Sequence, residues 1–168
     1  GVEAAGRDEI MAYLVKTLNE SKEDKIRQAC TSSISRLLIG SPQRCEMYRR
    51  HGGIAAQCGA YFAASSADEQ TSVLMSLWSC ISTLVPAGKA GVCRNEAWLT
   101  ECVKAGAFAV AEHAGAQRIP GGEELYVYMH GKSFRRDNRL LAKGIESQRN
   151  FAGRMPEIAG GRASPTRR

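Results

Sequence analysis

The strongest constraint on the fold is a similarity between two stretches of the chain, residues 6–37 and 53–84. A shift of 47 positions superimposes them without a gap and matches apolar residues at helical spacing. The matched pairs are Met11 with Cys58, Leu14 with Tyr61, Val15 with Phe62, Ile26 with Val73, Cys30 with Leu77, Ile34 with Ile81 and Leu37 with Leu84. One shift that serves two successive helices predicts that the stretches are copies of one helical unit.

Residues 41–84 show this unit most completely. The Ser-Pro pair at residues 41–42 predicts the start of a short helix that extends to Arg50. Two glycines then break the chain before a second helix over residues 54–63. After a polar turn, a long amphipathic helix over residues 69–84 is predicted. Its apolar face consists of Val73, Leu74, Leu77, Trp78, Ile81 and Leu84.

Partial copies flank this unit on both sides. The preceding copy predicts helices over residues 7–19 and 25–39, and the apolar stripe of the first is Ile10, Met11, Leu14, Val15 and Leu18. The following copy predicts short helices over residues 96–104 and 108–114. Residues 123–130 stand where its long helix is expected. That position favours a helix, although the alternation of the residues also fits a strand.

Glycine recurs near the second helix of each copy, at Gly6, Gly53 and Gly106. Such recurrence predicts either a backbone conformation that other residues tolerate poorly or a position where no side chain fits.

The order short helix, Gly turn, helix, polar turn, long amphipathic helix resembles an armadillo repeat. The closest matches are Gly-Gly-Ile at residues 52–54 and Leu-Trp-Ser-Cys-Ile-Ser at residues 77–82. The resemblance covers about two and a half repeats, residues 6–115. It implies an all-α fold, a short right-handed armadillo-like α-solenoid that offers a concave surface to other proteins.

One departure from the family bears on its ligands. The peptide-binding members carry an Asn in the third helix of successive repeats, and the matching segments here, residues 25–39 and 69–84, contain none. The resemblance therefore implies protein binding without importin-like recognition of extended basic peptides.

Charge divides the chain into two predicted parts. Residues 1–114 contain 12 Lys+Arg and 12 Asp+Glu, whereas the remaining residues contain 11 and 5, so the whole excess of +6 lies in the C-terminal third. We expect helical repeats over residues 1–115. Residues 116–168 are expected to form a basic, partly extended C-terminal arm of short helices and tail, because the Gly, Pro, Ser and Arg of the last stretch cannot build a core.

No set of residues predicts catalysis, a cofactor or a metal site. The chain has no P-loop, G-x-S-x-G or H-E-x-x-H motif, and its six cysteines form no C-x-x-C pair. We interpret the cysteines as small core residues. His51 and His113 are interpreted as residues at helix C-termini. Trp78 is expected in the core, while Trp98 fits either the core or a binding surface.

We therefore predict a non-catalytic scaffold or accessory subunit of a large multiprotein assembly. It would bind protein partners through the repeat surface and the basic arm. In the arm, the adjacent arginines Arg135 and Arg136 suit acidic groups or phosphate. The predicted partner-binding residues are Lys132, Phe134, Arg135, Arg136, Arg139 and Lys143. The alternative is an RNA-contacting subunit of an organellar ribonucleoprotein such as a mitochondrial ribosome. Against that alternative, pentatricopeptide RNA readers repeat nearer every 35 residues.

Two features bear on location. No apolar run approaches 18 residues, so no membrane span is predicted. The first residue, Gly1, and the basic tail favour a processed mitochondrial subunit, and a ciliary or cytoskeletal assembly is the rival expectation.

Overall fold

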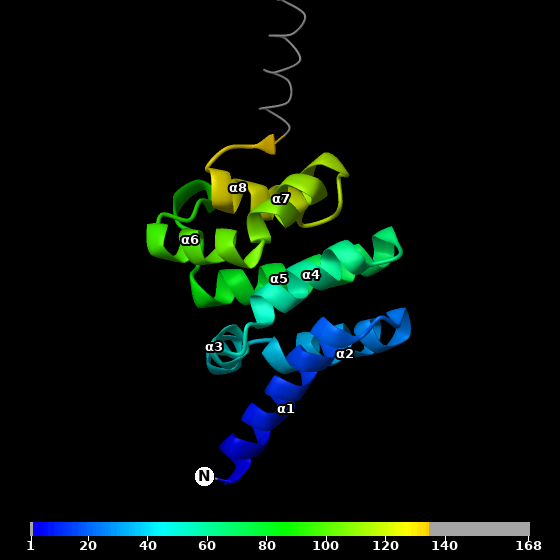
Figure 1. Cartoon of the computed structure of the whole chain (residues 1–168). Helices are drawn as coiled ribbons and strands as arrows, with labels where there is room; N and C mark the ends of the chain where they lie inside the picture. Colours follow the sequence, from blue (N-terminus) through cyan, green and yellow to red (C-terminus); the bar gives the residue numbers. More distant parts are fainter. Residues whose placement is uncertain (1, 135–168) are drawn as a thin grey trace, which may run out of the picture. The chain divides into compact units, whose positions relative to one another are not determined.

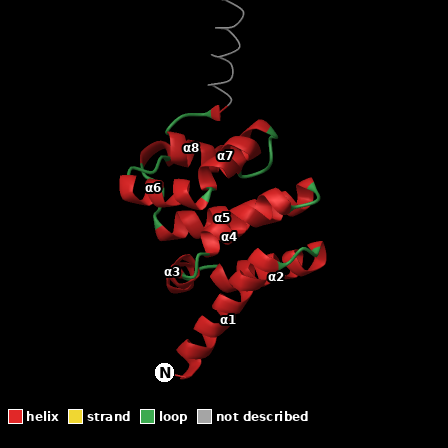
Figure 2. Ribbon diagram, in the orientation of Figure 1, coloured by secondary structure: helices red, strands yellow, loops and turns green. Residues whose placement is uncertain are grey.

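A computed structural model describes residues 2–134, with side chains from Gly6 onward (Figures 1 and 2). This part of the chain is all-helical, with eight α-helices, one short 3-10 helix and no strand. The helices are α1 (Val2–Glu20), α2 (Asp24–Leu38), α3 (Pro42–Arg50), α4 (Gly53–Ala63), α5 (Ala67–Leu84), η1 (Lys89–Gly91), α6 (Glu96–Ala105), α7 (Ala107–Ala116) and α8 (Gly122–His130). The predicted all-α class is confirmed for these residues.

The helices stack in successive layers. α1 and α2 pack on each other, and they also pack on α4 and α5, respectively. α4 lies between α1 and α7, and α8 packs along α7. Figure 1 shows α1 and α2 as the lowest layer, with α4 and α5 above them and α6, α7 and α8 at the far end. The arrangement places helices far apart in the sequence side by side.

Three of the predicted helix starts coincide with side-chain caps. The Ser41 hydroxyl accepts from the backbone N–H of Arg44 at 3.3 Å, with Pro42 in the first turn of α3. Ser66 caps α5 and Asn95 caps α6 in the same way. Because these signals are local in sequence, most helix bounds lie within two residues of the predicted ones.

The recurring glycines do not act alike. A Cβ at Gly53 would lie 2.3 Å from the Tyr48 ring, so no side chain fits there, as predicted. Gly106 has φ +98 and joins α6 to α7, matching Gly52, which has φ +76 at the start of α4. Nothing lies within 4 Å of a Cβ at Gly6, so the prediction is wrong for that position.

The core contains most of the predicted apolar face of α5. Leu77 and Ile81 are fully buried, and Trp78 is partly buried with its ring edge-on to Tyr128 at 5.2 Å. Trp98 belongs to the core as well, since it is buried and its indole N–H donates to the Tyr128 hydroxyl at 2.9 Å.

All six cysteines are free and buried, as expected of core residues. Burial raises the pKa of Cys58 and of Cys102 to about 12. A hydrogen bond between the thiols of Cys45 and Cys80 lowers the pKa of Cys45 and raises that of Cys80. The thiols of Cys58, Cys80 and Cys102 therefore remain protonated near neutral pH.

Ion pairs connect helices across the surface. Arg49 of α3 pairs with Glu46 of the same helix at 2.6 Å and with Glu101 of α6 at 2.7 Å. His51 follows α3, as predicted for a residue at a helix end, and its Nε2 lies 2.8 Å from a carboxylate oxygen of Asp8 in α1.

Three further observations bear on the predictions. Ile10 was assigned to the apolar stripe of α1 but is 52% exposed, and Ile26 and Phe62 of the matched pairs are exposed too. Residues 123–130 lie in helix α8, which is the alternative that their position in the repeat favoured. The predicted domain boundary between residues 115 and 116 falls inside α7, and the compact unit continues to Phe134.

Candidate protein-binding groove

A groove with a volume of about 570 Å³ lies between α2 and α5. We call it the α2–α5 groove. It is lined by Gln28, Thr31, Ser32 and Ser35 of α2, by Ser66 before α5, and by Asp68, Glu69, Thr71, Ser72, Val73 and Met75 of α5.

Helical spacing explains why hydroxyl groups meet here. Gln28, Ser32 and Ser35 are four and three residues apart, so they lie on one side of α2. Asp68 and Ser72 have the same relation on α5. The adjoining apolar faces pack α2 against α5, which leaves these two polar stripes facing each other across the groove.

The α5 side of the groove offers hydrogen-bond acceptors. The Thr71 hydroxyl donates to the Ala67 carbonyl at 2.9 Å, and the Ser72 hydroxyl donates to the Asp68 carbonyl at 3.2 Å. Because their protons are used within the helix, the two hydroxyls can present only lone pairs to a ligand. The carboxylates of Asp68 and Glu69 add negative charge, and the lining contains no basic residue.

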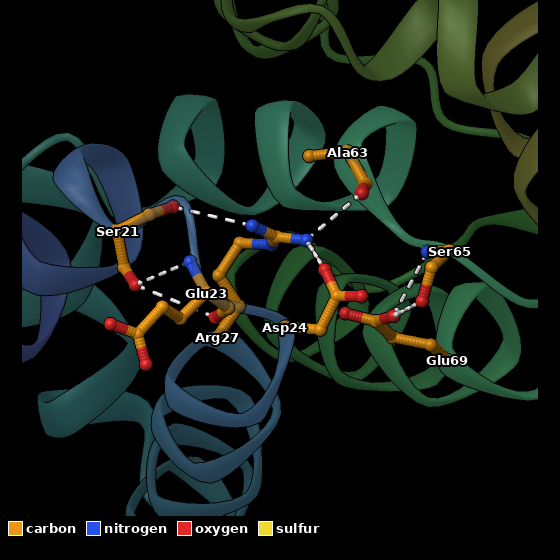
Figure 3. Close-up of polar contacts among 7 residues, drawn as sticks. All are labelled: Ser21, Glu23, Asp24, Arg27, Ala63, Ser65 and Glu69. Atoms are coloured by element: carbon orange, nitrogen blue, oxygen red, sulfur yellow. Dashed lines mark hydrogen bonds and ion pairs between the residues drawn. The ribbon is translucent and has the colours of Figure 1, made fainter.

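A buried arginine holds one end of the groove (Figure 3). Arg27 is 6% exposed, and its guanidinium pairs with the Asp24 carboxylate. It also donates to the Ser21 carbonyl at 3.3 Å and to the Ala63 carbonyl at 3.1 Å. Ala63 is the last residue of α4, so its carbonyl has no hydrogen-bond donor within the helix. The guanidinium of Arg27 supplies that donor. Arg27 thereby joins the α1–α2 turn to the end of α4.

Glu69 fixes the opposite wall at the start of α5 (Figure 3). Its Oε2 accepts from the backbone N–H of Ser65 at 3.0 Å and from the Ser65 hydroxyl at 3.2 Å. The Ser66 hydroxyl accepts from the Glu69 N–H at 3.2 Å. This arrangement is a capping box displaced by one residue. Ala63 and Ser65 are two residues apart, so the contacts of Arg27 and Glu69 hold the same end of the groove, beside the α4–α5 turn.

One buried polar atom of the lining, Oγ1 of Thr31, makes no hydrogen bond to the described part of the chain. Thr31 is 5% exposed, and its hydroxyl has no hydrogen-bond partner among the described residues. A buried hydroxyl without a partner costs about 1–3 kcal/mol.

The sequence placed partner binding elsewhere. Of the predicted partner-binding residues, Lys132 is exposed, and Phe134 packs edge-on to Tyr126 at 5.0 Å and lies close to Gly115. The other four, Arg135, Arg136, Arg139 and Lys143, lie outside the described residues. The groove itself was not predicted; its sequence signal is the run of hydroxyl residues at 31–35 beside an apolar helix face.

The groove is lined by hydroxyl, amide, carboxylate and apolar side chains, with no imidazole, thiol or amine. Within residues 2–134, no three His, Cys, Asp or Glu side chains are grouped to hold a metal ion. None of the helices described above combines the length and hydropathy needed to cross a membrane.

Comparison of the chain with protein-family models, with curated proteins and with solved structures finds no match.

Proposed function

We propose that this chain is a non-catalytic protein-binding subunit, an armadillo-like solenoid that holds an extended segment of a partner protein in the α2–α5 groove. The observation that carries the proposal is the groove itself, in which two polar helix stripes face each other above a packed core. A rigid groove of this kind restricts a ligand without needing to fold around it, which lowers the entropy lost on binding.

The order of packing supports the solenoid. In the armadillo resemblance, α3, α4 and α5 are the three helices of one repeat, and α1 and α2 are the last two of the preceding repeat. The contacts of α1 with α4 and of α2 with α5 are those expected between equivalent helices of neighbouring repeats. In this reading α2 and α5 are the long third helices, which line the concave surface of such solenoids.

The acceptors in the groove define the partner's chemistry. Backbone N–H groups and Lys or Arg side chains are the donors that such a lining can pair with. A segment rich in Asp or Glu would instead meet Asp68 and Glu69 with like charge. We infer that the bound segment is extended and carries Lys or Arg but few carboxylates. Because the helices lack the Asn of the peptide-binding members, we infer that hydroxyl and carboxylate oxygens, together with the Gln28 amide, contact the bound segment.

The groove is short. From Gln28 to Ser35 the axis of α2 rises about 10 Å, which corresponds to roughly three residues of extended chain. Contacts of that extent give weak affinity alone, so the groove would act with other contacts of the assembly. RNA binding, the other prediction, finds no support in this groove because its lining has no cation.

Two neighbouring serines provide a matched test. Ser32 and Ser33 are both exposed on α2, but only Ser32 lines the groove. The probes are two labelled peptides of eight residues, one alternating Ser with Lys and the other alternating Ser with Glu, titrated into the full chain by fluorescence anisotropy. We expect the Lys peptide alone to bind. Ser32→Trp should weaken it by about tenfold or more, and Ser33→Trp should leave it unchanged.

The outcomes are decisive in both directions. Equal binding of both peptides, or equal affinity of the wild-type chain and Ser32→Trp, would overturn the proposal. Equal losses from both Trp variants would show that binding does not depend on the groove side of α2 in particular, which also contradicts the proposal.

A further inference from the structure

The layer at the N-terminal end of the stack leaves an apolar face uncovered. α4 and α5 are covered by α1 and α2, whereas nothing described lies on the outer side of α1 and α2 (Figure 1). On that side Ile10 is 52% exposed, Tyr13 is 67% exposed and Ile39, just after α2, is 68% exposed. Four of the seven large apolar residues that are exposed in the described chain, these three and Ile26, belong to this layer. We call it the α1–α2 end face.

The 47-residue shift shows what these positions normally do. It places Ile10 on Gln57, Tyr13 on Ala60 and Ile26 on Val73. All three counterparts are buried, in the layer that α1 and α2 cover. The end face thus has the composition of a surface that another pair of helices covers.

The same face carries both knobs and a hole. A hollow of about 30 Å³ is lined by Arg7, Ile10, Met11, Leu37, Arg44 and Met47. Tyr13 stands one turn along α1 from Ile10, and Ile39 stands two residues beyond Leu37. A surface that presents protruding side chains next to a matching hollow can pair with a rotated copy of itself, as a two-fold interface requires.

Charge at the rim also favours self-pairing. The exposed charged residues of α1 on this face are Glu9, Glu20, Lys16 and, at the hollow, Arg7, whereas Lys25 and Arg36 flank the apolar stripe of α2. Two copies related by a two-fold axis, with α1 of each across from α2 of the other, would place Glu9 and Glu20 of one copy near Lys25 and Arg36 of the other.

We propose that the α1–α2 end face binds a second copy of this chain, forming a closed two-fold dimer. The far end favours closure, because Val103 is the one exposed large apolar residue of its described helices α6, α7 and α8, against four in the α1–α2 layer. Helices of this length present roughly 500 Å² per copy, at the low end for specific interfaces, so we expect dissociation in the micromolar range.

Sedimentation velocity of the full chain, from nanomolar to hundreds of micromolar, tests the proposal. We expect a monomer–dimer equilibrium with no larger species. Tyr13→Glu and, independently, Ile39→Glu should weaken it by about tenfold or more, because each places a carboxylate in the apolar contact. The matched control is Val103→Glu, since Val103 is 50% exposed on α6 and should tolerate the change. Circular dichroism melts confirm that all three variants are folded.

A monomer at every concentration would overturn the proposal, as would a dimer that Tyr13→Glu and Ile39→Glu leave intact. A concentration-dependent series of larger oligomers would show head-to-tail association and overturn it equally. Failure here leaves the α2–α5 groove untouched, because Ser32→Trp reports on the groove and should not alter the dimer.

Discussion

The ring of Tyr48 lies so close to the backbone of Gly53 that a Cβ at Gly53 would stand 2.3 Å from its Cε2 atom. Tyr48 is fully buried, and its hydroxyl donates to Gln57 Oε1 at 2.9 Å, so the ring cannot move aside without breaking that bond. The contact allows α3 and α4 to meet closely at the centre of the fold.

Gly53→Ala should therefore destabilise the chain, by about 1–3 kcal/mol, because the methyl group overpacks a filled site. Gly59→Ala is the matched control, since nothing lies within 4 Å of a Cβ at that helical glycine. There we expect a gain of about 0.5–1 kcal/mol from helix propensity. Urea unfolding measures both, and an unchanged midpoint for Gly53→Ala would contradict the close packing.

Leu77 is fully buried at the centre of α5. Leu77→Ala should cost about 2–5 kcal/mol, through lost burial and the cavity left behind. Val103→Ala, on the exposed side of α6, should cost far less. Thermal melts of the two variants that shift equally would show that α5 does not lie in the core.

Arg27 should be sensitive to shape as well as charge. Arg27→Lys keeps the cation but loses the planar fork that reaches Asp24 and Ala63 together, so we expect a loss of about 1–3 kcal/mol. Arg36→Lys, on the exposed side of the same helix, is the control and should be within about 0.5 kcal/mol of wild type. If the two lysine variants unfold at the same urea concentration, Arg27 does not hold the end of the groove.

Stability should fall steeply at alkaline pH. Burial raises the pKa of Tyr61 from its ordinary 10.0 to about 12 and that of Cys58 from 9.0 to about 12. Groups whose pKa is raised by folding stabilise the native state below the unfolded pKa, and this contribution is lost as pH rises through the folded pKa. We therefore expect a decline that begins near pH 9 and continues to about pH 12.

The variant Tyr61→Phe isolates one part of that decline. At neutral pH it should lose about 1 kcal/mol with the hydrogen bond between Tyr61 and His113. Between pH 10 and 12 its stability should fall less than that of the wild type. Parallel curves for the two chains, followed by urea unfolding across this range, would contradict the raised pKa of Tyr61.

The arm remains a prediction that the described residues do not test. Because Phe134 packs near Gly115 and Tyr126, the informative truncation ends at Phe134. We expect the shortened chain to remain folded by circular dichroism. If the arm holds acidic groups of a partner, truncation should remove the salt-dependent part of partner binding. Unfolding of the shortened chain would instead assign the arm to the fold.

Local signals explain what the sequence predicted well. The caps at Ser41, Ser66 and Asn95, the glycine breaks and the apolar periodicity each act within a few residues, and they set the helix bounds. The short helix α8 was ambiguous because nine residues cannot distinguish the two periodicities. Its packing along α7 supplies what its own sequence does not.

The groove escaped prediction for a different reason. It depends on two stripes, beginning at Gln28 and Asp68, that come together only when α2 packs on α5. Each stripe alone has the composition of an ordinary solvated helix face. Ile10 was misassigned for the converse reason, because an apolar residue at helical spacing does not reveal whether the chain itself covers it.

The burial of all six thiols gives the chain an internal set of reporters. Each cysteine becomes reactive only when the layer around it opens, so the rate of alkylation at a given site measures the free energy of that local opening. Cys30 belongs to the end layer, whereas Cys80 lies at the centre of α5. Comparing their labelling rates would show whether the stack frays from its N-terminal end or opens as one unit, with no engineered probe at all.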